Sequence, residues 1–508
     1  MPAASSVDRR TVLRAGALGA VAAAGGCAWP GGSTPAPVLT RTLRPTPADW
    51  HALAHGLAGD LVRPHDADYD SARRLYNPRF DRVRPAGVVE AANRHDVAEA
   101  IRFARRFGLV ARPRSGGHSY VGVSTAAGGL VVDMGRIRGV DYDSASQTAL
   151  VRAGSRLFDV HEALEPHGRS LPTGTCPTVG AAGLTLGGGV GVEGRAHGLT
   201  CDAVAALTVV TAAGRTLQVD ASHHADLFWA LRGGGGGNFG VVTAMRVRTF
   251  PAHVVGFYFV SWAASDAAAV IRGWQHRVGR MPRSAWANLH LEAGSSGSVA
   301  IRVVGVSLTG DGAGEAAALQ AAVGRPATSV STFSRSHADA IKLLAGCSTL
   351  TDQQCHLRPR GSLSREAFAA GSDVLGAPMS HQVATALVRV VRRRASAGRG
   401  AAVIIDPLGG AVSDHRPAAT AFRWRHALGT IQWYVGLPDA PRPADVAEAY
   451  GWIGRGHRVL APASVGGYVN YLEPGRAVGS YYGANLARLR QVKARYDPTG
   501  FFHSHYTV

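Results

Sequence analysis

The chain has 508 residues, of which 46% are hydrophobic and 18% are charged, and its formal net charge is +19. This composition excludes a disordered protein, and the length exceeds that of one compact core, so we expect two folded domains. The positive charge is distributed along the chain and reflects a bias toward arginine. We therefore expect no nucleic-acid partner.

The N-terminus resembles an export signal. The arginine pair at residues 9–10 precedes a short, weakly apolar stretch at residues 15–26, which is the order of a twin-arginine signal. That stretch is too short to be a permanent transmembrane helix, and Cys27 behind it is a candidate for lipid attachment. We predict a signal over residues 1–29, a linker over residues 30–47, no transmembrane span and export; a tail with a chance arginine pair is the alternative.

Short strands and helices alternate in the first half of the chain. The amphipathic helix predicted over residues 96–107 has Val97, Ile101 and Ala104 on one face, and a glycine follows it. Residues 212–215 predict a hairpin between two strands. The predicted elements are strands over 88–91, 109–112, 130–133, 149–151, 205–211, 216–219 and 241–250, and helices over 96–107, 158–164 and 225–231.

The pattern changes near residue 255. Beyond it, strand-like and helical runs alternate without comparable glycine-rich loops, which is typical of a separate α+β domain. The predicted elements here are strands over 254–260, 299–306, 401–405 and 429–434, and helices over 384–397 and 485–496. We predict one domain over residues 48–255, a second over residues 256–455, and a distinct C-terminal segment over residues 456–508.

The run Arg-Ser-Gly-Gly-His-Ser-Tyr at residues 114–120 is suited to a phosphate-bearing cofactor. Glycine lets backbone N–H groups approach phosphate oxygens, and Arg114 together with the loop amides would neutralise a pyrophosphate. His118 adds a nucleophile beside this loop. The Gly-x-Gly-x-x-Gly turn of a dinucleotide-binding Rossmann fold is missing, so an NAD fold is disfavoured, and a simple tight turn remains the alternative.

The run Gly-Thr-Cys-Pro-Thr-Val-Gly at residues 174–180 carries a second nucleophile, Cys176. Cys347 and Cys355 lie eight positions apart in a chain that we expect to be exported, so a local disulfide is favoured. Cys201 is expected to be a buried thiol, which leaves Cys176 without an evident partner. This suits a modified thiol, and a structural cysteine is the alternative. No spacing resembles a zinc site, and we predict no metal.

Several motifs together resemble the berberine bridge enzyme-like FAD-linked oxidases. They occur in the family order and cover nearly everything after residue 80: residues 114–120, 174–180, 226–237 and 238–242, and finally Tyr468-Val469-Asn470-Tyr471. The resemblance implies an α+β fold with a two-part FAD-binding domain of the vanillyl-alcohol oxidase type, in which residues 456–508 complete the domain and the active site. The antiparallel sheet of the substrate domain, residues 256–455, is expected to form one wall of the substrate groove.

The resemblance also implies the cofactor and its contacts. FAD would be attached covalently through His118 to the flavin 8α-methyl group and through Cys176 to flavin C6, in the bicovalent subgroup. Val179 would lie near flavin C4a, where a small residue permits access of O2, and Leu184 replaces a frequent histidine, so redox tuning is expected to differ. The other expected cofactor-binding residues are Arg114, Ser115, Gly116, Gly117, Ser119, Gly180 and Gly183 near the pyrophosphate, Val241 and Val242 near the adenosine, and Asn470.

Tyr471 matches the tyrosine that many members use as the general base, and Tyr468 is the second catalytic candidate, with a core aromatic as its alternative role. A phenol has a pKa of roughly 10, so it needs a charged or acid–base neighbour, for which Arg425 and Tyr468 are candidates. The resemblance implies a secreted oxidase that transfers a hydride from an alcohol or sugar to flavin N5 and reduces O2 to H2O2. The alternatives are a natural-product oxidase acting on C–N bonds or closing rings, a dehydrogenase with another acceptor, and a flavin-binding protein without turnover.

Overall fold

The structure is a computed structural model that describes residues 44–508. The predicted signal, Cys27 and nearly all of the predicted linker lie outside the described residues. The first helix, α1, begins at Pro47, the last residue of that linker. Across the described range, the helices are all too short or too polar to cross a bilayer.

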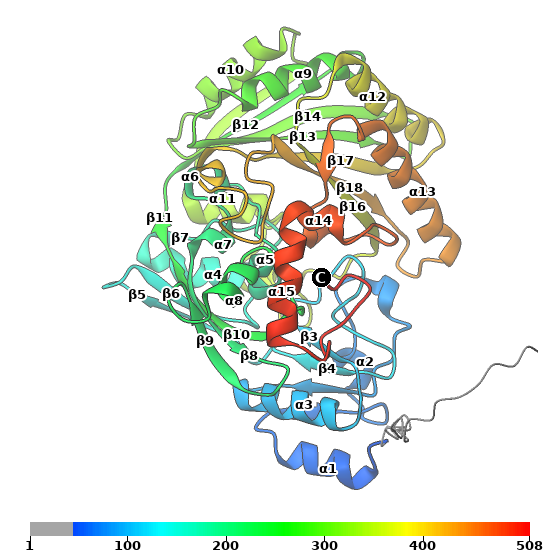
Figure 1. The fold of residues 1–508 in the computed structure, drawn as a ribbon. Helices are drawn as coiled ribbons and strands as arrows, with labels where there is room; N and C mark the ends of the chain where they lie inside the picture. Colours follow the sequence, from blue (N-terminus) through cyan, green and yellow to red (C-terminus); the bar gives the residue numbers. More distant parts are fainter. Residues whose placement is uncertain (1–43) are drawn as a thin grey trace, which may run out of the picture. The chain divides into compact units, whose positions relative to one another are not determined.

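Two sheets form the part of the structure that contains the first half of the chain (Figure 1). In the four-stranded sheet, of order β1-β2-β4-β3, β4 lies parallel to both of its neighbours. The five-stranded sheet, of order β5-β6-β10-β8-β9, is antiparallel. Their strands are β1 Asp60–Val62, β2 Gly87–Glu90, β3 Ala111–Arg114, β4 Leu130–Asp133, β5 Val140–Asp143, β6 Thr148–Arg152, β8 Val204–Val210, β9 Thr216–Asp220 and β10 Val241–Arg248. A short pair, β7 Arg169–Ser170 and β11 Phe250–Pro251, lies beside them.

An eight-stranded antiparallel sheet dominates the rest of the molecule, with helices along one of its faces (Figure 1). Its order is β15-β12-β14-β13-β17-β18-β16-β19. Its strands are β12 Val255–Trp262, β13 Ala285–Ala293, β14 Val299–Ser307, β15 Ser329–Arg335, β16 Phe368–Leu375, β17 Ala401–Pro407, β18 Gly429–Gly436 and β19 Ser464–Gly466. This is the antiparallel sheet expected for the substrate domain, so the predicted α+β fold class is confirmed.

The helices follow the burial pattern of their sequences. In α3, Asn93 caps the N-terminus by accepting from the backbone N–H of His95 and Asp96, and Val97 and Ile101 are fully buried. The α-helices are α1 Pro47–His55, α2 Tyr69–Ala72, α3 Arg94–Arg106, α4 Leu157–Leu164, α5 Ala181–Leu186, α6 Gly194–His197, α7 Thr200–Ala203, α8 Ala225–Ala230, α9 Ala267–Val278, α10 Gly312–Val323, α11 His337–Leu344, α12 His381–Ser396, α13 Pro443–Leu460, α14 Gly479–Tyr482 and α15 Leu486–Tyr496.

The two large cores explain how the chain is divided. One core contains residues from α1 to β10, together with Tyr482, Leu489 and Phe502 near the C-terminus. The other contains residues between Tyr258 and Ala463, around the eight-stranded sheet. The C-terminal residues therefore pack in the first core, although the chain before them, up to Ala463, belongs to the second core.

One predicted boundary needs correction. The division between residues 455 and 456 falls inside α13, which runs from Pro443 to Leu460. The following strand, β19, still pairs with β16 of the eight-stranded sheet. The second sheet thus extends along the chain as far as Gly466, because α13 buries apolar side chains against it and β19 pairs with β16 through the backbone. The boundaries of the predicted signal and linker stay predictions.

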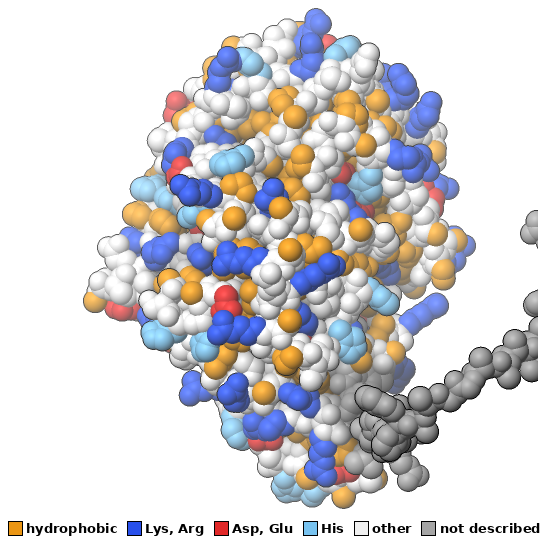
Figure 2. All heavy atoms as spheres, viewed as in Figure 1, with side chains coloured by type: hydrophobic (Ala, Val, Ile, Leu, Met, Phe, Trp, Pro, Cys, Tyr) orange, Lys and Arg blue, Asp and Glu red, His pale blue; other side chains and the backbone are white. Residues whose placement is uncertain are grey.

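Positive side chains are spread over the visible face of the molecule. Figure 2 shows Lys and Arg side chains among neutral and apolar ones over most of that face. The predicted disulfide between Cys347 and Cys355 is present, and it packs against Phe158 of α4. Cys201 is fully buried, as predicted, and Cys176 carries a free thiol.

Candidate active site

A cavity of about 600 Å³ lies between the first two sheets, the C-terminal segment and the eight-stranded sheet. Its volume is in the range of cofactor and substrate cavities, roughly 300–1,000 Å³. It brings together nearly all the side chains and glycines singled out in the sequence. The predicted residues that line it are Ser115, Gly116, Gly117, His118, Ser119, Cys176, Val179, Gly180, Gly183, Val241, Val242, Tyr468, Asn470 and Tyr471.

The two nucleophile-bearing loops touch each other through glycine. A methyl group at Gly180 would collide with the backbone N of Gly116 and with Ser115 Oγ, and a methyl group at Gly116 would collide with the Gly180 backbone. Glycine is needed at both positions because the two backbones lie in direct contact. This contact sets the spacing between the loop of His118 and the loop of Cys176.

Two alanine variants separate this contact from a general effect of losing glycine. We expect Gly180→Ala to lower the free energy of unfolding by about 1–3 kcal/mol, the usual cost of overpacking. Gly451→Ala is the matched control, because Gly451 lies exposed in α13, a methyl group there meets only Arg455 Nη1 at 3.9 Å, and alanine favours a helix. Urea denaturation of both variants checks this, and equal destabilisation would contradict the close backbone contact.

Arg114, one of the predicted cofactor-binding residues, is not among the residues that line the cavity. Its Nε donates to Asp133, and its Nη2 donates to the carbonyl oxygen of Ala72. These two contacts fix the start of the loop, while Arg114 Nη1 is buried without a hydrogen-bond partner within residues 44–508, so its role at a pyrophosphate stays a prediction. Arg112, two residues earlier, does line the cavity, and its buried Nε has no hydrogen-bond partner within residues 44–508.

His118 lies half-buried beside the cavity with one ring face covered. The Tyr76 ring stacks on it, with centroids 3.8 Å apart and planes at 18°. His118 Nε2 lies 2.9 Å from Thr178 Oγ1. Burial, reinforced by the Arg156 guanidinium, lowers the pKa of His118 to about 3. The imidazole is therefore neutral at physiological pH and retains a lone pair.

Cys176 opens into the same cavity, and its sulfur lies 3.7 Å from Thr178 Oγ1. Protein encloses the thiol on its other sides, which raises its pKa, while hydrogen bonds from Thr178 and the backbone of Val179 lower it. Thr178 thus contacts both nucleophiles. The sequence analysis did not single out this threonine, although it lies within the motif.

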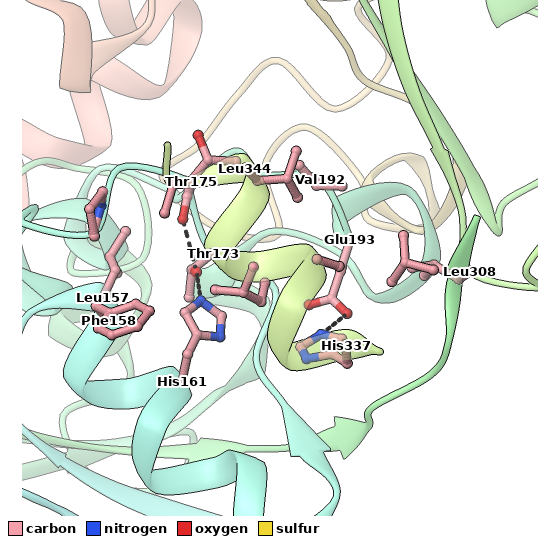
Figure 3. A pocket seen from close by; sticks show the side chains of 16 residues that line it. Leu157, Phe158, His161, Thr173, Thr175, Val192, Glu193, Leu308, His337 and Leu344 are labelled. Carbon is pink, nitrogen blue, oxygen red and sulfur yellow. Dashed lines mark hydrogen bonds and ion pairs between the residues drawn. The ribbon is translucent and has the colours of Figure 1, made fainter. Parts of the chain in front are cut away.

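A second cavity, of about 20 Å³, lies behind the segment that carries Cys176 (Figure 3). The two cavities share Leu157, Gly174 and Thr175, so this segment is the wall between them. In Figure 3, His161 bonds to Thr173 across 2.9 Å, and His337 of α11 pairs with Glu193 across 3.1 Å. These buried contacts support the wall from the side opposite His118.

Tyr471 lines the large cavity and has an acidic neighbour. Its ring stacks in parallel on Tyr120, with centroids 5.0 Å apart, and Gln432 Nε2 donates to the Tyr120 hydroxyl across 2.5 Å. Burial, followed by the nearby Tyr120 and Asp406, raises the pKa of Tyr471 well above its usual value. Burial also raises the pKa of Asp406 to about 6. Asp406, at the end of β17, is a functional candidate that the sequence analysis missed.

Tyr468 has a different environment. Its hydroxyl oxygen accepts from the backbone N–H groups of Gly189 and Val190, at 3.0 and 3.1 Å, and from Asn470 Nδ2, at 2.8 Å. Asn470 Nδ2 also donates to the carbonyl oxygen of Leu184. Burial raises the pKa of Tyr468 to about 12, although these donors oppose the rise. Tyr468 is held firmly, which fits a positioning role better than proton transfer.

Arg425 is not the charged neighbour of Tyr471 that the sequence analysis considered. Its guanidinium forms two hydrogen bonds with the Asp202 carboxylate, at 2.6 and 2.7 Å, and the two side chains are 0% and 3% exposed. The charge is neutralised by this pair. Arg425 therefore joins α7 to the loop after β17 and provides no positive field for a phenolate in the cavity.

A buried charge network anchors the segment that carries both tyrosines. His457 Nδ1 lies 2.6 Å from Asp373 Oδ2, its Nε2 lies 2.7 Å from Glu473 Oε2, and Arg476 pairs with Glu473. Ser372, beside Asp373 on β16, accepts from the backbone N–H of Tyr468 across 2.9 Å. Glu473 follows Tyr471 by two positions, so the network fixes this segment against the eight-stranded sheet.

Stability should depend on the charge of His457. Despite its burial, hydrogen bonds to Asp373 and Glu473 raise the pKa of His457 to about 9. The unfolded-state pKa is about 6.5, so the stabilisation is complete below that pH and is lost as the pH rises through 9. We expect His457→Gln to remove on the order of 2–3 kcal/mol at pH 6 and much less at pH 10.

The measurement is the free energy of urea unfolding from pH 6 to pH 10. His223→Gln is the control, because the His223 ring is 73% exposed. A loss for His457→Gln that is the same at every pH would show that the histidine acts by packing alone.

The eight-stranded sheet forms one wall of the cavity, as predicted. Phe368 of β16, Ile404 of β17, and Gln432 and Tyr434 of β18 line it. The Tyr434 hydroxyl donates to Glu366, which is the only carboxylate among the lining residues of the described chain. This wall offers aromatic faces and few charges.

One group of potential metal ligands occurs in the described residues, made of Asp159, Glu162 and His356. His356 Nδ1 lies 3.5 Å from Asp159, and its Nε2 lies 3.1 Å from Glu162. Both ring nitrogens therefore already face carboxylates, and we assign no metal to this group.

The large cavity fits FAD on its own features. Glycine backbone from three segments faces it, at Gly116–Gly117, Gly180–Gly183 and Gly235–Gly237. The open space beside Gly183 would be filled by a side chain, and the Arg112 Nε donor is unpaired within the described range. These groups suit a pyrophosphate, and the neutral His118 and the thiol of Cys176 both border the same cavity.

Comparisons with known proteins agree with this assignment. A family model described as "FAD binding domain" matches residues 85–220, and one described as "Berberine and berberine like" matches residues 467–508. The uncharacterized FAD-linked oxidoreductase YvdP of Bacillus subtilis (strain 168) is 31% identical over 457 residues, which are 88% of this chain and 97% of that protein. The xylooligosaccharide oxidase of Thermothelomyces thermophilus is 30% identical over 84% of this chain and 88% of its own.

Solved structures show the same fold. The carbohydrate oxidase from Microdochium nivale, in complex with a substrate analogue, has a TM-score of 0.80 and 26% identity, and it covers 90% of this chain and 98% of its own. A chitooligosaccharide oxidase has a TM-score of 0.80 and 25% identity over the same shares of the two chains. The motifs, the cavity and these relatives together identify the chain as a member of the berberine bridge enzyme-like family, an FAD-dependent oxidoreductase of the oxidase type.

Proposed function

We propose that this oxidase acts on a hydroxyl group of a neutral carbohydrate or a related alcohol, with FAD attached through both His118 and Cys176 and with O2 as the electron acceptor. The observation that carries the proposal is one cavity with two nucleophiles on its cofactor-binding side and an aromatic, nearly uncharged wall on the eight-stranded sheet. The names of relatives as xylooligosaccharide and chitooligosaccharide oxidases support this substrate class.

The chain's own residues supply binding and proton transfer. FAD, when bound, supplies the hydride acceptor. Tyr471 takes the proton of the substrate hydroxyl, since it lines the cavity beside the aromatic wall. A phenol in this environment is protonated at neutral pH, so it must release its own proton before it can accept one from the substrate. Asp406, with a pKa of about 6, is largely ionised above that pH and makes no direct hydrogen bond to the phenol, so it receives this proton through an intervening water.

The wall opposite the glycine loops orients the substrate. Tyr120, Tyr434 and Phe368 present flat faces on which sugar rings stack, and Gln432 and Glu366 offer polar groups for hydroxyls. Val179 also lines the cavity and leaves room for O2. The natural-product oxidase is the second candidate, because the same aromatic wall also suits a planar alkaloid-like substrate.

We also propose export through the twin-arginine-type signal at residues 1–29. The disulfide between Cys347 and Cys355 supports this location, because disulfides persist in oxidising compartments. Lipid attachment at Cys27 is the alternative to release from the membrane.

Anaerobic reduction of the bound flavin tests the proposed reaction. Neutral oligosaccharides and simple alcohols should bleach the flavin absorbance, and admitted O2 should restore it with one H2O2 per flavin. Bleaching that O2 reverses only slowly would identify a dehydrogenase. Bleaching by amines but not by sugars would identify a natural-product oxidase, and no bleaching by any substrate would contradict an enzymatic role for this cavity.

A further inference from the structure

We propose that Thr178 is a positioning residue that prepares both His118 and Cys176 for bonding to the flavin. The proposal rests on the bicovalent attachment put forward above. It goes beyond it by assigning one hydroxyl group to two attachment reactions. Thr178 is buried, at 5% exposure, and its Oγ1 lies 2.9 Å from His118 Nε2 and 3.7 Å from Cys176 Sγ.

The contact with His118 determines which ring nitrogen can react. An N–H at Nε2 that donates to Thr178 Oγ1 leaves the Nδ1 lone pair free. The backbone of Thr178 also favours a proton on this ring, while burial and Arg156 keep the ring from holding two. The Tyr76 stack prevents the ring from rotating. The imidazole is thus presented to the cavity in one tautomer and one orientation.

The contact with Cys176 uses the hydrogen-bond donor of the same hydroxyl, which the contact with His118 leaves free. A threonine hydroxyl has one donor and two acceptor positions, so after accepting from His118 it can still donate its proton toward sulfur. The Thr178 and Val179 backbones also favour the thiolate, against the effect of enclosure. A hydrogen bond to sulfur stabilises the anion, which is the reactive form of a thiol.

The backbone around Thr178 is fixed on both sides. The N–H of Phe158 donates to the carbonyl oxygen of Pro177 across 3.1 Å, and the N–H of Leu157 donates to that of Val179 across 2.9 Å. The first turn of α4 therefore holds the residues before and after Thr178. A β-branched side chain on a fixed backbone has few rotamers, so the hydroxyl stays between the two nucleophiles.

The chemistry of each link balances as an oxidation. A C–H bond of the flavin and the N–H or S–H bond of the protein are lost, and one C–N or C–S bond forms. Two protons and two electrons are released, and O2 takes them up as H2O2. Thr178 contributes by placing the proton on Nε2 of His118 and by stabilising the sulfur anion of Cys176 before its bond forms.

Two variants distinguish the hydroxyl from the methyl group. Thr178→Val keeps the shape and loses the hydroxyl, and Thr178→Ser keeps the hydroxyl and loses a methyl group. We expect Thr178→Val to slow both attachments by at least about tenfold, the effect of one pKa unit, and Thr178→Ser to attach at nearly the wild-type rate. A packing role predicts the reverse order, because serine then leaves a void.

The experiment follows attachment over time after FAD is added to protein purified from riboflavin-limited cells. Peptide mass spectrometry measures the flavin-bearing fraction at His118 and at Cys176 separately, and Thr178→Ala replaces Thr178→Val if the latter does not fold. If Thr178→Val attaches flavin at the wild-type rate at both positions, the role of Thr178 is overturned and the bicovalent proposal stands. A wild-type protein that forms no link at either position would overturn the bicovalent proposal, and the role of Thr178 with it.

Discussion

Replacing Tyr471 with phenylalanine is expected to lower kcat by about 10²- to 10⁴-fold, the usual contribution of a general base. The phenol lines the cavity beside the aromatic wall, and the variant keeps the ring that stacks 5.0 Å from Tyr120. Flavin content and thermal stability should change little, because the Tyr471 backbone contact with Ser372 and its ring stacking on Tyr120 are both kept. Stopped-flow reduction of the flavin measures the effect directly.

Two controls identify the proton path. Tyr468→Phe should cost less in flavin reduction than Tyr471→Phe, because the Tyr468 oxygen is held by three internal donors. The reduction rate of the wild type should rise with pH through about 6, as the Asp406 carboxyl loses its proton and becomes an acceptor. The Asp406→Asn variant should reduce its flavin more slowly, and its reduction rate should not rise with pH through about 6. A Tyr471→Phe enzyme within threefold of the wild type would place the base elsewhere.

Replacing Arg425 with methionine is expected to destabilise the protein by about 3–5 kcal/mol, because it leaves the Asp202 carboxylate buried without its partner. The pair joins the region around α7 to the loop after β17, and both side chains are almost fully buried. The free energy of urea unfolding at pH 7 measures the loss. Lowering the pH should reduce it, since an unpaired Asp202 becomes neutral on protonation.

A matched exposed pair provides the control. Arg283 also forms two hydrogen bonds with an aspartate, Asp414, at 2.7 and 2.8 Å, but the two side chains are 60% and 50% exposed. Arg283→Met should therefore change stability little, because water already screens the pair. Equal losses for the two variants would mean that burial of Asp202 is not the cause.

Local sequence patterns predicted most of the strands in the first half of the chain, but only three of its helices, α3, α4 and α8. The helix predicted over residues 96–107 is α3, Arg94–Arg106, and the hairpin at residues 212–215 connects β8 and β9. When one face of a helix or strand is buried, apolar residues recur at a regular spacing, and this spacing can be recognised in the sequence. The glycine content around Gly183 gave no helix signal, although residues 181–186 form α5, because tertiary contacts outweigh the propensity of glycine.

The cavity-lining residues were predicted where a motif carries them and missed where tertiary structure brings them in. The motif could not show which of Arg112 and Arg114 faces the cavity, because that depends on Asp133 in the neighbouring strand. Asp406 stands alone in the sequence and comes close to Tyr471 only because β17 pairs within the eight-stranded sheet. Arg425 was one of two candidates for assisting the phenol, but its charge is paired with Asp202, which lies far away in the sequence.

Covalent attachment of FAD through two side chains is the central claim, and peptide mapping of the purified protein tests it most directly. The account predicts that wild-type protein carries flavin on the His118 peptide and on the Cys176 peptide. His118→Ala should keep only the cysteine link, Cys176→Ala only the histidine link, and the double variant neither. A wild-type protein that releases all of its flavin on acid precipitation, or that carries it on one peptide alone, would contradict the account.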